Sequence, residues 1–158
     1  MADSEGPLDL LARITGLATD SPRFLEALTH PSLANERRDV QHNQRLEFLG
    51  DAVLGFCASE LLYERFPSAD EGALTRMRAQ LVNAEALAAW GRSVGLAAAL
   101  RVGRGADSAG LRGGTNVLAD AVEALIAADQ ASSSGGANKD EICAEMEARR
   151  GISVAGCP

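Results

Sequence analysis

The chain is short, acidic and poor in aromatic residues: 158 residues, 46% apolar, 4% aromatic, with a net charge of −7. This length fits one domain with a sizeable core and excludes a large multidomain assembly, while the acidic balance argues against binding nucleic acid through net charge alone. The periodic apolar segments are dominated by Ala and Leu rather than by alternating Val, Ile and Thr. The sequence therefore predicts an all-α fold.

The cysteines and the N-terminal residues indicate a cellular compartment. Three cysteines form an odd set without metal-ligand spacing, which favours a reducing environment over a disulfide framework. The first residues are acidic and carry no apolar signal segment, and no run approaches the roughly 18 apolar residues of a membrane span. We expect a cytoplasmic protein with no membrane partner.

The N-terminal third predicts two short helices and a loop. Apolar residues at helical spacing over 8–17 indicate the first helix. Ser21-Pro22 is a capping residue followed by proline at the first helical position, which predicts that a second helix begins there. Thr29-His30-Pro31-Ser32 should end this helix, because the residue before proline avoids helical geometry. The polar stretch 35–43 is expected to be a loop.

The central part predicts a long helix followed by shorter ones. The long helix should cover about residues 43–65 and stop at Phe66-Pro67. Further helices are expected at about 73–83 and from Asn83 to Gly95, with one more turn over 96–100. These segments would supply most of the apolar faces of the core.

The C-terminal third begins with a glycine-rich stretch. Residues 103–114 contain five glycines, which predicts a mobile loop, and the helix after it should be capped by Thr115 or Asn116. From these patterns we expect a folded domain over residues 1–130. Residues 131–158 are expected to form a flexible linker and a short C-terminal helix.

Two pairs of acidic residues lie in apolar helical segments. Glu47 and Asp51 are four residues apart and Asp120 and Glu123 three apart, so each pair shares one helix face. One such pair alone is most simply a solvated surface. Two pairs in apolar surroundings instead predict a shared site for Mg²⁺ or Mn²⁺, because a hard cation removes the repulsion between neighbouring carboxylates.

The segments around these acids resemble bacterial ribonuclease III. The similarity covers roughly residues 22–128, in matching order and spacing, which is far more specific than a single short motif. The matching blocks are Ala27-Leu28-Thr29-His30-Pro31-Ser32, Arg45-Leu46-Glu47-Phe48-Leu49-Gly50-Asp51-Ala52-Val53-Leu54, Arg65-Phe66-Pro67, Glu71-Gly72, Arg76-Met77-Arg78-Ala79 and Leu118-Ala119-Asp120-Ala121-Val122-Glu123-Ala124-Leu125.

The resemblance implies the all-α endonuclease domain fold working as a homodimer, with an active site at each end of a valley. It implies a metal-dependent endoribonuclease that cuts double-stranded RNA to 5′-phosphate and 3′-hydroxyl ends, with a role in rRNA or mRNA processing. By the same resemblance the metal ligands would be Glu47, Asp51, Asp120 and Glu123.

The resemblance also assigns roles to individual residues. Asp51 and Glu123 would be catalytic, Glu71 would position the RNA, and Phe48 would pack into the partner subunit. Gln44 stands where the family often has a third acid of the signature helix. It retains hydrogen-bonding capacity without charge, so we expect altered choice of the scissile bond rather than loss of activity.

The basic residues are almost all arginine, 14 against the single Lys139, and arginine suits contacts with phosphate. Candidates for RNA contact lie after Glu71-Gly72 and around the glycine-rich stretch, although arginines on helices are more often solvated or salt-bridged. These candidates are Arg76, Arg78, Arg101, Arg104 and Arg112.

Two further features bear on function. Bacterial members of the family normally carry a double-stranded-RNA-binding domain after this point, and about 30 residues are too few to form one. The chain is then either a shortened version of a longer enzyme or a naturally minimal one, and its RNA affinity should be low and steeply salt-dependent.

Alternative functions are a non-catalytic RNA-binding or ribosome-associated module on the same fold, or a structural dimerisation domain. The four retained acids disfavour both.

Overall fold

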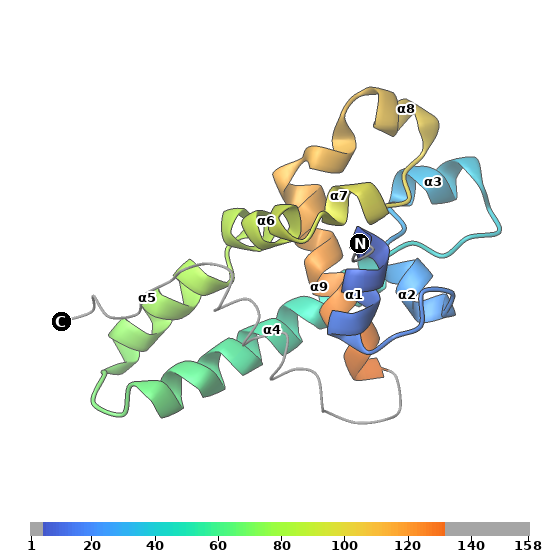
Figure 1. Ribbon diagram of the computed structural model, residues 1–158. Coiled ribbons are helices and arrows are strands. Elements are labelled where there is room, and N and C mark those ends of the chain that lie inside the picture. The colour runs from blue at the N-terminus through green and yellow to red at the C-terminus, as the bar shows by residue number, and fades with distance from the viewer. Residues whose placement is uncertain (1–4, 132–158) are drawn as a thin grey trace.

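The structure, a computed structural model, describes residues 5–131; in this part helices are joined by turns and loops, and one isolated bridge between Thr29 and Arg101 takes the place of any strand, which confirms the all-α prediction (Figure 1). None of the helices in this part is long and apolar enough to cross a membrane. The linker and C-terminal helix expected for 131–158 lie outside the described residues apart from Ala131 itself, the last residue of the last helix. The elements are α1 (Pro7–Thr15), α2 (Pro22–Ala27), α3 (Pro31–Glu36), α4 (Gln44–Arg65), α5 (Glu71–Leu81), α6 (Ala84–Ser93), α7 (Leu96–Ala99), α8 (Arg104–Ser108), the 3-10 turn η1 (Leu111–Gly113) and α9 (Thr115–Ala131).

Helix α9 lies at the centre of the core, with α1, α2, α4 and α6 packed around it (Figure 1). Its residues from Leu118 to Ala128 are buried except for Asp120 and Glu123, which are half-buried. Many of the buried positions are alanines, whose small side chains let neighbouring helices approach closely. Two acids therefore interrupt an otherwise apolar central helix.

Helices α4 and α9 come into backbone contact at Gly50. A Cβ atom at this position would overlap the main-chain carbonyl of Glu123, so only glycine fits there. Glu47 lies three residues before Gly50 on α4, and Glu123 is the residue that Gly50 touches on α9. The close approach thus brings the two acid-bearing segments together.

Most helix boundaries agree with the sequence patterns. The long helix α4 begins and ends within a residue of its prediction, and the Ser21 side chain accepts a hydrogen bond from the Phe24 N–H at the start of α2. Helix α9 begins at Thr115, so the residue before it is Gly114 and neither of the two expected caps, Thr115 or Asn116, takes the cap position. The short turn α7 also forms where it was expected.

One short helix was not predicted, and one loop prediction was wrong. Helix α2 ends at Ala27 and Pro31 starts α3, because proline suits the first turn of a helix and the His30 side chain caps it. The glycine-rich stretch 103–114 forms α8 and η1 rather than a mobile loop. Gly103 is buried against α3, where a Cβ would collide with Glu36 and the Ser32 carbonyl. This glycine therefore serves close packing and not flexibility.

Replacing Gly50 by alanine should destabilise the protein by about 3 kcal/mol, because the methyl group would force α4 away from α9. The matched control is Gly55→Ala on the same helix, where a Cβ meets nothing within 4 Å. That change should be neutral or stabilise by up to about 1 kcal/mol. Chemical denaturation of both variants measures the difference, and equal effects would contradict the close-contact role of Gly50.

Candidate metal centre

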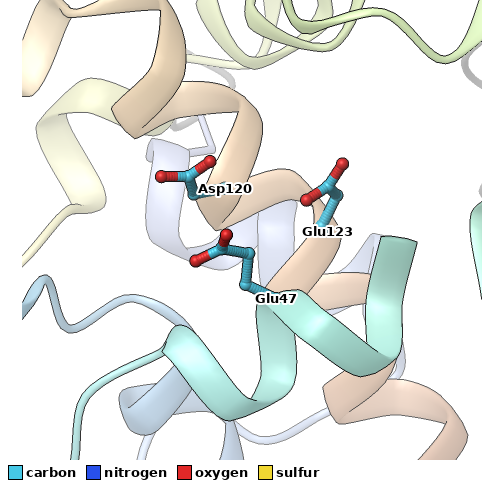
Figure 2. Close-up of side chains that lie close together, drawn as sticks. All are labelled: Glu47, Asp120 and Glu123. Carbon is cyan, nitrogen blue, oxygen red and sulfur yellow. The ribbon is translucent and has the colours of Figure 1, made fainter. Parts of the chain in front are cut away.

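Three carboxylates from two helices converge at the α4–α9 contact. Glu47 comes from α4, and Asp120 and Glu123 come from α9; each offers one oxygen within 4.8 Å of the others (Figure 2). Two oxygens bound to one Mg²⁺ at about 2.1 Å lie at most about 4.2 Å apart. Small side-chain adjustments would therefore let all three reach one ion. The all-oxygen donor set suits a hard divalent cation rather than zinc.

The electrostatics of the three carboxylates favour a proton or a cation. Burial raises the pKa of Glu123 to about 7, and the charges of the surrounding carboxylates add to this shift. Burial also raises the pKa of Glu47, with further contributions from Asp120 and Asp51. Burial raises the pKa of Asp120 as well. All three groups are thus held where ionisation is costly unless positive charge is supplied.

Asp51, the fourth predicted ligand, lies beside this group. It is exposed on α4 one turn after Glu47, and its carboxylate is not among the three that converge. Its charge nevertheless raises the pKa of both Glu47 and Glu123, which places it at the edge of the centre. Direct ligation by Asp51 remains a prediction.

His30 borders the centre from the α2–α3 junction. Its Nδ1 accepts a hydrogen bond from the Ser32 N–H at 3.1 Å, so its role as the cap of α3 agrees with the structural role predicted for it. Burial lowers the pKa of the imidazole, and the nearby Asp120 carboxylate opposes that shift. His30 therefore combines a structural bond with proximity to one of the converging acids.

The other candidate residues are not among the three converging acids. Glu71 begins α5, accepts a hydrogen bond from the Thr75 hydroxyl and lines a groove of about 800 Å³ between α4 and α5. Gln44 is exposed at the first position of α4. Phe48, on the same helix, is 82% exposed. The structure leaves the predicted roles of all three untested.

The five candidate arginines differ in their contacts. Arg101 donates to the Thr29 hydroxyl, Arg112 to the Leu100 carbonyl, and Arg78 to the Ser59 hydroxyl. These bonds give the three side chains partners inside the protein. Arg76 and Arg104 are exposed on α5 and α8, as Arg78 is on α5, and neither has a hydrogen bond of this kind. They are the members of the set best placed to meet a phosphate group.

Known proteins resemble this chain in sequence and in the arrangement of its helices. The family model described as Ribonuclease-III-like matches residues 21–146. This chain belongs to the ribonuclease-III-like family. The chain is 48% identical to ribonuclease 3 of Nitratidesulfovibrio vulgaris over 80% of its length and 51% of the relative's. It is 53% identical to the Oleidesulfovibrio alaskensis protein of the same name, over 67% of its length and 47% of the relative's.

A solved structure in the ribonuclease III family supports the same assignment. The nuclease domain of ribonuclease III from Campylobacter jejuni aligns with a TM-score of 0.81 and 29% identity, over 92% of this chain and 99% of that one. The chain spans about half the length of the curated ribonuclease 3 relatives that it matches. The resemblance seen in the sequence is thereby confirmed at the level of family and fold.

The raised pKa of Glu123 predicts how the stability of this ribonuclease-III-like chain depends on pH. The folded state holds the Glu123 proton more tightly than the unfolded state, so metal-free stability should fall as pH rises from about 4.5 towards about 7. Glu123→Gln, which cannot ionise, should match the wild type near pH 5 and exceed it in melting temperature near pH 8. Thermal unfolding in a chelator measures this, and added Mg²⁺ at pH 8 should stabilise the wild type more than the variant. If Glu123→Gln is no more stable than the wild type near pH 8, ionised Glu123 does not destabilise the folded protein and the prediction is wrong.

Proposed function

We propose that this chain is a metal-dependent endoribonuclease that hydrolyses phosphodiesters of double-stranded RNA, leaving 5′-phosphate and 3′-hydroxyl ends. The observation that carries the proposal is the convergence of Glu47, Asp120 and Glu123 at the α4–α9 contact. Family membership supports it, since the matched relatives are called ribonuclease 3. Processing of ribosomal or messenger RNA is the corresponding biological role.

The proposed reaction follows from the chemistry of the centre. Glu47, Asp120 and Glu123 would hold Mg²⁺ or Mn²⁺. The bound ion would supply an activated water and stabilise charge on the leaving 3′ oxygen. Asp51, exposed beside them, would orient the attacking water by accepting its hydrogen bond. His30 would support the site by capping α3, since its Nδ1 accepts a hydrogen bond from the Ser32 N–H.

A non-catalytic RNA-binding module on the same fold is the alternative function. Such a module has no use for three half-buried carboxylates whose pKa values are raised by burial, since they lower stability without contacting a base or phosphate favourably. Retention of this costly arrangement favours the enzyme. RNA contact would then fall mainly to exposed arginines such as Arg76 and Arg104.

Replacing Glu123 by glutamine should reduce cleavage of a long RNA duplex in Mg²⁺ at least about a hundredfold. Loss of a direct ligand should cost no less than loss of an outer residue that only orients ligands. The control is Glu64→Gln, an exposed acid on α4 outside the converging group. Gel analysis of duplex fragments measures the rates, and a binding assay should show that the Glu123 variant retains RNA. Binding without cleavage by the wild type, over a series of salt and Mg²⁺ concentrations, would favour the non-catalytic module.

We further propose that the chain acts as a homodimer through the aromatic stripe of α4. Phe48, Phe56 and Tyr63 are 82%, 63% and 73% exposed, and their spacing places them along one side of the helix. The groove between α4 and α5 continues this apolar surface. Burying one exposed phenylalanine contributes roughly 1.5–3 kcal/mol, and a two-fold interface uses each position twice. The Campylobacter jejuni relative is likewise described as having a region involved in dimer formation.

Phe48→Asp should convert the dimer to a monomer while leaving the helical content unchanged, because it places a charge in the proposed interface. Leu8→Asp is the matched control, since Leu8 is also an exposed apolar residue but lies on α1. Sedimentation equilibrium gives the mass, and circular dichroism checks folding. A wild type that is monomeric at all accessible concentrations would disprove the dimer. If the Phe48 variant dimerises as the wild type does, the dimer interface does not include Phe48.

A further inference from the structure

The start of α4 differs from the starts of the other helices that follow a capping residue. Ser21, Asp70 and Asn83 each use a side-chain oxygen to accept a hydrogen bond from the first turn of α2, α5 and α6, respectively. Asn43 precedes α4 but makes no such capping bond. The longest helix of the described part thus gives up a common source of helix stability.

Asn43 instead ties α4 to the segment that follows α2. It is 3% exposed, and its side-chain amide donates to the Ala27 carbonyl at 3.3 Å. Its backbone N–H donates to the Thr29 carbonyl at 2.9 Å. Its own carbonyl accepts the Glu47 N–H at 2.8 Å. One buried residue therefore links the α2–α3 junction directly to the backbone of a converging acid.

The same junction is held from its other side. The His30 N–H donates to the Arg101 carbonyl at 2.9 Å, and the Arg101 N–H donates to the Leu28 carbonyl at 2.8 Å. The Arg101 guanidinium adds a bond to the Thr29 hydroxyl. Asn43 is consequently attached to a segment that cannot easily shift.

Glu47 lies between two fixed points of α4. Asn43 holds the helix one turn before it, and Gly50 holds the helix against Glu123 one turn after it. The contact at Gly50 sets the separation of α4 and α9, and Leu46 and Leu54, on either side of it, are buried in the core. The hydrogen bonds of Asn43 add an attachment at the first turn of the helix, on the other side of Glu47.

We propose that Asn43 is a positioning residue of the metal centre, fixing the first turn of α4 so that Glu47 meets Asp120 and Glu123. This role rests on the proposed function only in so far as the three acids bind a divalent cation. It needs no contact between Asn43 and the ion or the RNA. Residues that orient ligands in this way typically contribute tenfold to a hundredfold to metal affinity.

The test is Mn²⁺ binding to the RNA-free protein, measured by calorimetry and by electron paramagnetic resonance. Asn43→Ala should weaken binding at least about tenfold. In cleavage assays, the Mg²⁺ concentration for half-maximal rate should rise by a similar factor, while the rate at saturating Mg²⁺ changes little. A merely structural role would lower the folded fraction without shifting the Mg²⁺ requirement.

Two variants separate positioning from general loss of stability. Asn83→Ala removes an asparagine that does cap its helix, α6, and should lower the melting temperature without changing Mn²⁺ affinity. Asn43→Asp keeps the size of the side chain but presents an acceptor to the Ala27 carbonyl. Its added negative charge would by itself tighten Mn²⁺ binding, so weaker binding by this variant can come only from misplaced ligands.

The outcomes distinguish this proposal from the proposed function. Unchanged Mn²⁺ affinity in both Asn43 variants, or an equal loss in Asn83→Ala, would overturn the positioning role. Absence of Mn²⁺ binding by the wild type would overturn both the metal centre and the role of Asn43. If the wild type binds Mn²⁺ in a way that depends on Asn43 but cleaves no RNA duplex, the positioning role is supported. The proposed nuclease activity is then disproved.

Discussion

The arrangement of this protein depends on the contact between the backbones of α4 and α9 at Gly50. Packing of side chains alone leaves helices roughly 8–10 Å apart, whereas a glycine facing a carbonyl lets them come closer. At that separation, acids one turn away on α4 and directly on α9 reach a common point. The apolar, alanine-rich surface of α9 extends this close packing along the core. The fold and the acid centre thus share one geometric requirement.

The acid centre opposes the stability of the helices that form it. Carboxylates in an apolar core favour the protonated state, and the pKa of Glu123 near neutrality is the clearest sign of this conflict. A purely structural helix would gain by replacing such residues with apolar ones. The α4–α9 packing therefore has to be strong enough to hold like charges together until a cation joins them.

Much of the fold follows from local sequence patterns, and so does the identity of the acids. Ser21 and Pro22 marked the start of α2, and apolar runs interrupted by acids marked the α4 and α9 segments that converge. Helix α3 is missed because a proline predicts the end of one helix as readily as the first turn of the next, which His30 caps here. Helix α8 is missed because its cause is tertiary: Gly103 packs against α3, although composition suggests a flexible loop. The attachment of Asn43 to Ala27 was equally invisible, since asparagine before a helix normally indicates a cap. Gly50 in an apolar helix was a usable signal for close approach, but Gly55 in the same helix meets nothing within 4 Å, so the sequence could not tell the two glycines apart.

Helix α4 carries Glu47 near its start and exposed aromatic residues along most of its length. Its 22 residues form one uninterrupted rod of about 33 Å. In the proposed dimer, the rigid helix α4 and not a loop would therefore set the distance between the two acid centres. Duplex RNA has a regular rise, so a fixed distance between the centres would give a constant offset between the cuts on the two strands.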